Sequence, residues 1–189
     1  MVRSEQQGAA HVKLLRTIRL DASDTFVFEP AAEPGEWAVS GAFVFWGGDP
    51  RKLEGKARTA FRSGFLGVGS LGWSTLVQIV EASADDHAAL VDQLARQLVA
   101  QFGAPNVATA RTAAEEEVAF AASLCNQPAG TLIAVHRSVE DGAVREAFRT
   151  LRPREGEKPL RAFSFLEVEG EEEPGEEIDL AALAKPKRD

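Results

Sequence analysis

Apolar and polar residues alternate along the first third of the chain, and this alternation predicts three strands. Residues 11–20 form the first, and its apolar face carries Val12, Leu14, Ile18 and Leu20, with Arg16 among them. Phe26 and Phe28, two positions apart, predict a second short strand at residues 25–29. Residues 36–46 predict a third strand. Both of its faces are apolar, which is typical of a central strand covered on both sides.

Helical spacing replaces this alternation in the middle of the chain. Asp49 followed by Pro50 is typical of a helix start, and the helix that follows is expected to end near Gly64. A second helix is predicted over residues 85–102, where the apolar positions recur every four residues: Leu90, Leu94, Leu98 and Phe102. Gly103 and Pro105 end it, and an alanine-rich helix is expected over residues 106–126.

Further strands complete the pattern. Residues 73–82 are rich in Val, Ile and Thr, and residues 131–139 and 143–151 flank an Asp-Gly pair that is a strong hairpin signal. Residues 160–168 predict a last strand. The order βββαβααβββ, with grouped strands and grouped helices, predicts an α+β fold with a mixed, mostly antiparallel sheet and helices on one face.

The length of 189 residues fits one domain, which we expect over residues 11–168. Residues 1–10 are predicted to be a disordered N-terminus, and residues 169–189 an acidic flexible tail. The net charge is −8, but nine acidic and three basic residues lie within 167–189. The remaining body is close to neutral, so nucleic-acid binding is not expected. No apolar run is long enough for a membrane span, and the single Cys125 fits a reducing, cytoplasmic location.

Residues 61–83 combine four closely spaced glycines with aromatic side chains and almost no charge. Such a segment is either a tight packing corner or a ligand site, and it is expected to use backbone angles that favour glycine. Residues 67–72 match G-x-G-x-x-G, but dinucleotide binding needs a strand before the motif and a helix after it. Here the order is reversed, which favours a structural turn. A nest of backbone amides that holds an anion remains open.

Catalytic and metal-binding patterns are not found. His11, His87 and His136 lie in three separate predicted elements, and no serine stands in G-x-S-x-G. The glutamates at 115–117 point in three directions on a helix. Glu117 could face inward with Ala113, Ala114 and Ala121, but the expectation is a solvated face for all three. No catalytic residue, metal ligand or cofactor is therefore predicted. Arg145, Arg149 and Arg152, opposite Arg137, form either a small anion site or cross-strand pairs with Glu140 and Glu146.

Six segments carry a resemblance to a known family: HVKLLRTIRLD, GEWAVSGAF, AFRSGFLGVGSLGWSTLVQIVEA, EEEVAFAASLC, PAGTLIAVHR and REAFRTLRP. Over residues 11–153 the chain resembles a bacterial family that is catalogued only as a domain of unknown function. The resemblance implies a small cytosolic bacterial protein. It brings no activity, cofactor or site residue with it.

Two functions are consistent with these observations. The first is a non-catalytic protein-binding or assembly protein, with a homodimer as the first candidate. It rests on aromatic residues that exceed what one small core hides: Phe26, Phe28, Trp37, Phe43, Phe45, Trp46, Phe163 and Phe165. The alternative is a small-molecule binding protein or enzyme that takes an anionic ligand at the glycine-rich turn, residues 64–72. Its predicted site residues are Arg62, Phe65, Gly67, Gly69, Gly72, Trp73 and Trp46.

Overall fold

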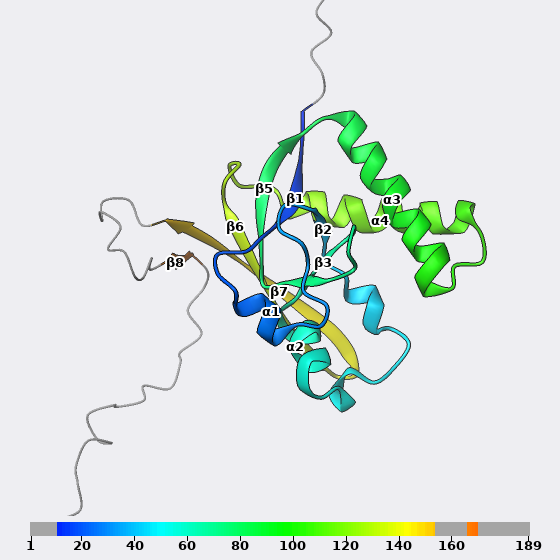
Figure 1. The fold of residues 1–189 in the computed structure, drawn as a ribbon, viewed down its shortest axis with the longest axis horizontal. Coiled ribbons are helices and arrows are strands. Elements are labelled where there is room, and N and C mark those ends of the chain that lie inside the picture. The colour runs from blue at the N-terminus through cyan, green and yellow to red at the C-terminus, as the bar shows by residue number, and fades with distance from the viewer. Residues whose placement is uncertain (1–10, 154–165, 170–189) are drawn as a thin grey trace, which may run out of the picture.

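The computed structural model describes residues 11–153 and 166–169, which form strands and helices in an α+β arrangement (Figure 1). The elements are β1 (Val12–Ile18), α1 (Ser23–Val27), β2 (Trp37–Val39), η1 (Ala42–Phe45), η2 (Pro50–Lys52), α2 (Gly55–Ser63), β3 (Phe65–Gly67), β4 (Trp73–Ser74), β5 (Leu76–Ala82), α3 (Ala84–Phe102), α4 (Val107–Ser123), β6 (Leu132–Glu140), β7 (Ala143–Pro153) and β8 (Leu166–Glu169). The predicted fold class is confirmed.

The named strands form one sheet in the order β4-β3-β2-β1-β5-β6-β7-β8. Each neighbouring pair among them is antiparallel, and Ala31 forms an isolated parallel bridge with Trp73, so the expected, mostly antiparallel sheet is confirmed. The longest ladder is the predicted hairpin of β6 and β7, in which Glu140 is opposite Ala143. Asp141 and Gly142 both have positive φ at its turn, as an Asp-Gly hairpin requires.

The sheet is rolled, and the chain connection shows why. Thr75 alone separates β4 from β5, yet β3, β2 and β1 lie between these two strands in the sheet. The five strands must therefore curl until β4 returns to the start of β5. Asp24 fixes this junction, because its carboxylate accepts hydrogen bonds from the Thr75 backbone N–H (3.1 Å) and the Thr75 hydroxyl (2.5 Å). Ser74 closes it further by donating to the carbonyl of Ile18.

Helices α3 and α4 pack against each other, and both contact the sheet at β1 (Figure 1). The Ser83 hydroxyl accepts the N–H of Asp86, and the Asp86 carboxylate accepts the N–H of Ser83, which is a complete capping box at the start of α3. Asn106 caps α4 by accepting the N–H of Thr109. The helices predicted over residues 85–102 and 106–126 are confirmed as α3 and α4, and the observed bounds differ from the predicted ones by at most three residues.

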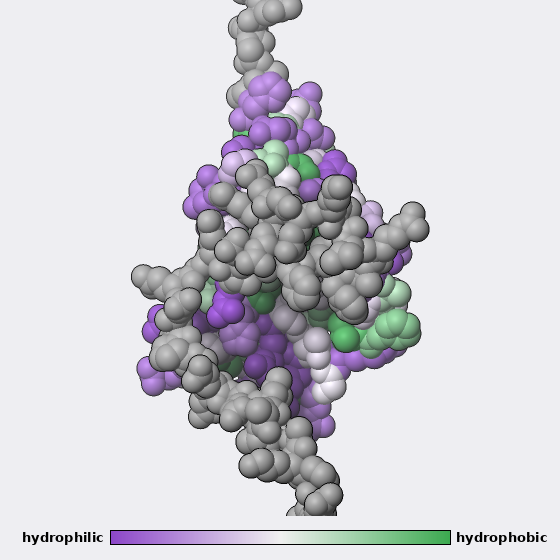
Figure 2. Space-filling view, turned by 90° about the vertical axis from the view of Figure 1, so that its left-hand side faces the viewer, coloured by the Kyte–Doolittle hydropathy of each residue, from purple (hydrophilic) through white to green (hydrophobic). Residues whose placement is uncertain are grey.

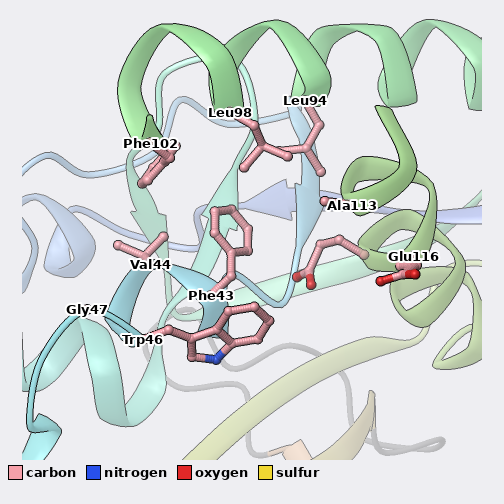
Figure 3. Close-up of a pocket in the computed structure, with 10 residues that line it drawn as sticks. Phe43, Val44, Trp46, Gly47, Leu94, Leu98, Phe102, Ala113 and Glu116 are labelled. Carbon is pink, nitrogen blue, oxygen red and sulfur yellow. The ribbon is translucent and has the colours of Figure 1, made fainter. Parts of the chain in front are cut away.

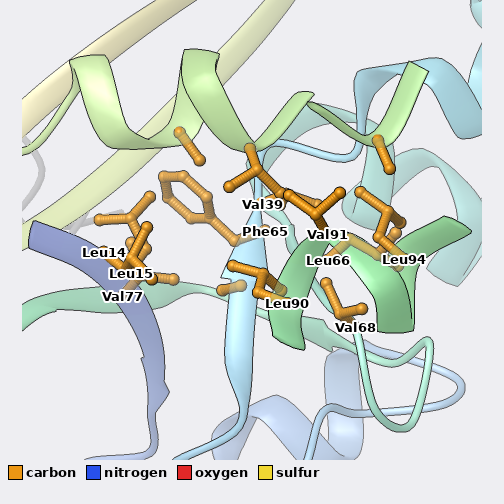
Figure 4. Close-up of a cluster of buried hydrophobic side chains, with 14 of the residues drawn as sticks. Leu14, Leu15, Val39, Phe65, Leu66, Val68, Val77, Leu90, Val91 and Leu94 are labelled. Atoms are coloured by element: carbon orange, nitrogen blue, oxygen red, sulfur yellow. The ribbon is translucent and has the colours of Figure 1, made fainter. Parts of the chain in front are cut away.

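The hydrophobic core lies between the rolled sheet and these two helices (Figure 4). Leu14 and Leu15 are adjacent residues on β1 and therefore point to opposite faces, but both are fully buried. The central strand is thus β1, covered on both sides. The sequence pattern had assigned that position to residues 36–46 instead.

The strand predicted at residues 25–29 is wrong. Residues 23–27 form the one-turn helix α1, and Asp21 accepts the N–H of Ser23 just before it. The two phenylalanines do not share a face: Phe26 is 74% exposed, whereas Phe28 is buried in the core. A pair of aromatics two positions apart is too short a pattern to outweigh the hydrogen bonds that Asp24 accepts from Ser74 of β4 and from Thr75.

The strand predicted at residues 36–46 is also largely wrong. β2 ends at Val39, and Gly41 then turns the chain with a φ of +77°. A side chain at Gly41 would meet Leu66, with a Cβ–Cβ separation of 2.5 Å, so this position needs glycine for space as well as for conformation. The aromatic residues that follow leave the sheet and enter the 3₁₀-helix η1. This departure creates the pocket described below.

Other predictions fall outside the part of the chain that the structure describes. These are the N-terminus at 1–10, the acidic tail at 169–189 apart from Glu169, and residues 160–165 of the last predicted strand. Within the described residues, no helix is long and apolar enough to cross a bilayer. Figure 2 shows the face drawn at the left of Figure 1, where the coloured residues are mostly hydrophilic, with a group of hydrophobic residues at the right.

Candidate functional site

A pocket of about 520 Å³ lies between η1 and the two long helices (Figure 3). Its walls are mostly apolar and come from three parts of the chain: Phe43, Val44, Trp46 and Gly47 from η1 and the residues after it, Leu94, Leu98 and Phe102 from α3, and Ala113, Glu116 and Glu117 from α4. This volume falls in the range of small-molecule and side-chain binding sites.

The wall from α3 is the continuation of a core stripe. Leu90 and Leu94 are fully buried, Leu98 is 9% exposed, and Phe102, the next member of the stripe, is 38% exposed. The helix therefore runs past the end of the core, and its last apolar turn faces the pocket. The ring of Phe102 meets that of Phe43 edge to face, with centroids 5.3 Å apart.

Trp46 lies at the mouth of the pocket and is 75% exposed. In Figure 3 its indole lies beside Phe43, whose ring points towards Leu98 on α3. Tryptophan is a residue that folding normally covers over most of its surface. The exposed indole and the partly exposed Phe102, which line the same pocket, are therefore an apolar surface that remains available after folding.

Two carboxylates supply the polar part of the pocket. Glu117 is half-buried, and one of its oxygens accepts the backbone N–H of Gly41 at 2.9 Å. Burial raises the pKa of Glu117, and the nearby charge of Glu146 adds to the rise, whereas the Gly41 hydrogen bond and Arg137 oppose it. The expectation that every glutamate of 115–117 is solvated is wrong for Glu117. Glu116 is exposed at the edge of the same pocket.

Behind Glu117 lies a buried polar network centred on Arg137 of β6. This side chain is fully buried and donates to the carboxylate of Glu146 (2.7 Å) and to the carbonyls of Phe61 (3.0 Å), Gly64 (2.7 Å) and Ser40 (2.5 Å). It thereby joins β6, β7, the end of α2 and the end of β2. The hairpin arginines were expected to form either an anion site or cross-strand pairs. Two of them form cross-strand ion pairs, Arg137 with Glu146 and Arg145 with Glu140 (3.6 Å).

The structure does not gather the seven residues predicted around the glycine-rich turn into one site. Phe65 and Trp73 are buried in the core, where Trp73 stacks on Phe45 at 5.2 Å. Trp46 belongs to the pocket described above. Arg62 lies on the exposed side of α2, in a different hollow.

The turn binds a carboxylate of the protein itself through one backbone amide and one hydroxyl. The carboxylate of Glu36 accepts the backbone N–H of Ser70 (2.7 Å), the hydroxyl of Ser70 (2.5 Å) and the N–H of Glu33 (2.8 Å). The backbone amides of Gly67, Val68 and Leu71 donate to backbone carbonyls. The amide of Gly72 donates to the hydroxyl of Ser70. These donors are therefore engaged by the fold.

The glycines of the turn are needed for space and not for conformation. Gly64, Gly67, Gly69 and Gly72 all lack positive φ, and the residue that adopts it there is Leu71. A Cβ on Gly72 would lie 2.5 Å from the backbone of Ala31, and one on Gly69 would lie 2.6 Å from Glu36. The expectation of special backbone angles is wrong for these glycines, whereas the packing corner is confirmed at Gly72.

A second, shallower hollow of about 250 Å³ lies between α2 and β6 and has a basic lining. It includes Arg51, Arg58, Arg62 and His136. Arg51 pairs with Asp49 at 2.9 Å. Arg58 and Arg62 form no ion pair with another described residue. They are four positions apart on one helix, so their positive charges repel each other without a negative charge between them.

The other candidate groups have structural surroundings. Cys125 is buried, and burial raises the pKa of its thiol to about 11, so the reactive thiolate is disfavoured. Ser74 donates to the carbonyls of Ile18 and Leu76. Within residues 11–153 and 166–169, no three His, Cys, Asp or Glu side chains stand together as a metal site.

Sequence reasoning missed most of this pocket. Phe43 was placed on a strand and Phe102 in a core stripe. A signal for Glu117 was present, because Ala114, Glu117, Val118 and Ala121 follow the spacing of one buried helical face. No local signal places η1 opposite α3, since that contact depends on the turn at Gly41.

Comparison with known protein families identifies the family of the chain. A family model described as "family of unknown function (DUF6505)" matches residues 12–166. No curated protein and no solved structure matches the chain.

Proposed function

Because the chain belongs to this family of unknown function, DUF6505, we propose a function from the site alone: a non-catalytic binding protein that docks a protein partner in the aromatic pocket. The first candidate for that partner is a second copy of the chain. We propose a location in the bacterial cytoplasm, because the chain resembles a bacterial family over residues 11–153 and its single cysteine, Cys125, fits a reducing compartment.

The observation that carries this proposal is Trp46, 75% exposed at the mouth of an apolar pocket. Tryptophan is the residue most enriched among those that dominate binding energy at interfaces. A tryptophan side chain offers about 200 Å². Covering the exposed three quarters of it at about 25 cal/mol per Å² yields about 4 kcal/mol, before the cost of association is subtracted. One side chain thus supplies a useful share of the affinity.

The composition of the walls also supports binding. The lining is aromatic and aliphatic apart from Glu116 and Glu117, and Glu117 already accepts the N–H of Gly41. Interface cores have this composition, with aromatic residues enriched and few charged groups.

The test compares two exposed aromatic residues. Trp46→Ala removes the proposed anchor, and Phe26→Ala removes an aromatic that is equally exposed (74%) but lies in α1, outside the pocket. Molar mass is measured by light scattering over a concentration series. We expect the wild type and Phe26→Ala to move towards a dimer, and Trp46→Ala to remain a monomer.

A wild type that stays monomeric at every concentration overturns the homodimer. The same pair of variants then tests another partner: a protein that is retained from the native host by Phe26→Ala but not by Trp46→Ala supports the proposal. If no protein shows that difference, the binding function itself is refuted.

One observation favours a second candidate, an anionic small molecule. Arg58 and Arg62 face a hollow and have no ion pair among the described residues, so a phosphate or carboxylate group would neutralise both. The glycine-rich turn is less suitable, since Glu36 occupies the amide of Ser70 and the amides of Gly67, Val68, Leu71 and Gly72 donate within the fold. Inorganic phosphate and pyrophosphate should raise the melting temperature of the wild type but not of Arg62→Gln. Arg96→Gln, which changes an exposed arginine on α3, is the matched control.

A further inference from the structure

We propose that the aromatic pocket recognises a cation on an apolar stem, namely a lysine or arginine side chain of the docked partner, with Glu117 and Glu116 as its counter-charges. This inference rests on the proposed function and names the partner chemistry. It follows from three observations: unpaired carboxylates, aromatic walls, and a buried arginine that is already fully engaged.

The two glutamates of the pocket differ from their neighbour on the same helix. Glu115 pairs with Arg111 at 3.1 Å, whereas neither Glu116 nor Glu117 forms an ion pair with any residue that the structure describes. Glu117 is half-buried in an apolar wall, and its one recorded hydrogen bond is from the N–H of Gly41. A carboxylate in such surroundings is costly unless a positive charge approaches it.

Among the residues that the structure describes, the cation that acts on Glu117 is Arg137, and its donors are committed elsewhere. Arg137 gives its five recorded hydrogen bonds to Glu146, Ser40, Phe61 and Gly64. The charges that act on Glu117 from the neighbouring elements are therefore Glu146 on β7, which repels, and Arg137 on β6, which attracts. Glu116 adds a second negative charge at the pocket edge.

The aromatic residues supply the second attraction. Phe43, Phe102 and Trp46 line the same pocket as the two carboxylates (Figure 3). Aromatic faces attract ammonium and guanidinium groups, and tryptophan does so most strongly. The aliphatic stem of lysine or arginine matches the apolar wall formed by Leu94 and Leu98. An anion would be repelled by both glutamates, and a neutral group would leave Glu117 desolvated without a counter-charge.

The experiment uses three ligands with similar apolar stems and head groups of different charge. n-Hexylammonium, 1-hexanol and hexanoate are titrated into the full chain, and binding is followed by NMR at the indole N–H of Trp46 and at the amide of Gly41, which donates to Glu117. We expect hexylammonium to bind at least tenfold more tightly than hexanol, and hexanoate to bind more weakly than hexanol.

The variants identify the source of the preference. Glu117→Gln keeps an acceptor for Gly41 and should reduce hexylammonium affinity to that of hexanol, while hexanol affinity stays the same. Glu116→Gln should reduce the preference in part, and it serves as the second variant because this residue is exposed. Glu115→Gln on the same helix, outside the pocket, should leave all three affinities unchanged.

The outcomes separate this inference from the function on which it rests. Equal affinities for hexylammonium and hexanol overturn the cation preference but leave the pocket as an apolar binding site. No response at Trp46 and Gly41 to any of the three ligands overturns both the inference and the pocket. A peptide with one lysine between leucines should bind more tightly than the same peptide with norleucine and more tightly than hexylammonium. If free hexylammonium binds more tightly than the lysine peptide, the idea that a protein partner supplies the cation is overturned.

Discussion

Replacing Arg137 with methionine should cause a large loss of stability, because this arginine joins four separate segments. Its side chain is fully buried and ties β6 to β7 through Glu146, to the end of α2 through the carbonyls of Phe61 and Gly64, and to the end of β2 through Ser40. Methionine fills much of the same volume but donates no hydrogen bond. The substitution therefore isolates the polar contacts from simple packing.

The expected magnitude follows from what is left behind. Removing one partner of a buried ion pair costs about 3–5 kcal/mol, because the other charge stays buried without compensation. Glu146 is 18% exposed and keeps the hydroxyl of Ser40 as a donor, which places the cost at the lower end, about 3 kcal/mol. The total stability of a domain is about 5–15 kcal/mol, so this is a large fraction of it.

Urea unfolding at neutral pH measures the effect. With a denaturant slope of about 2 kcal/mol per molar, a loss of about 3 kcal/mol lowers the midpoint by about 1.5 M. Arg149→Met is the matched control, since Arg149 is an exposed arginine on the neighbouring strand and its replacement should shift the midpoint little. A double variant, Arg137→Met with Glu146→Leu, should be more stable than Arg137→Met alone, because it no longer buries an unpaired carboxylate.

Two results would refute this reasoning. A loss below about 1 kcal/mol for Arg137→Met would mean that water or a rearranged side chain satisfies the three carbonyls. A double variant less stable than the single one would mean that Glu146 contributes through other contacts, and the network would then not be a simple ion pair.

Three further predictions concern single sites. Gly72→Ala should lower stability by more than about 1 kcal/mol, since its Cβ meets the backbone of Ala31 at 2.5 Å, whereas Gly48→Ala, with no atom within 4 Å, should not; urea midpoints decide between them. Burial raises the pKa of Glu117, so protonation of this group stabilises the fold, and that contribution is lost as pH rises through the raised pKa. Measured from about pH 4 upwards, the stability of Glu117→Gln should therefore increase relative to the wild type, and a constant difference would contradict this. Cys125, buried and with a pKa of about 11, should react with a disulfide reagent at pH 8 at the rate of unfolding, and fast labelling of the folded protein would contradict that.

The sequence was sufficient where a long stretch of chain obeys one period. The four apolar positions of α3 predicted that helix correctly, and the Asp-Gly pair predicted the hairpin of β6 and β7. In these elements the local preference and the tertiary contacts agree, so the pattern is reliable.

It was insufficient where one contact outweighs a short pattern. Residues 25–29 alternate like a strand, but Asp24 binds Thr75 and the segment becomes helical. The single-residue link at Thr75, which forces the sheet to roll, has no signature in the hydrophobic pattern. The pocket depends on both features, because rolling the sheet brings the end of β2 close to α4.

The residues from 40 to 43 link the stability of the fold to the proposed recognition. The carbonyl of Ser40 accepts from Arg137, the N–H of Gly41 donates to Glu117, and Phe43 then forms the pocket wall against Phe102. The peptide group between Ser40 and Gly41 is thus held on both sides, by the side chains of Arg137 and Glu117. A partner cation that approaches Glu117 acts on a carboxylate whose orientation Gly41 already fixes, so the site is pre-organised and the cost of ordering it was met during folding. A variant that loosens this segment should therefore lose affinity before it loses the fold.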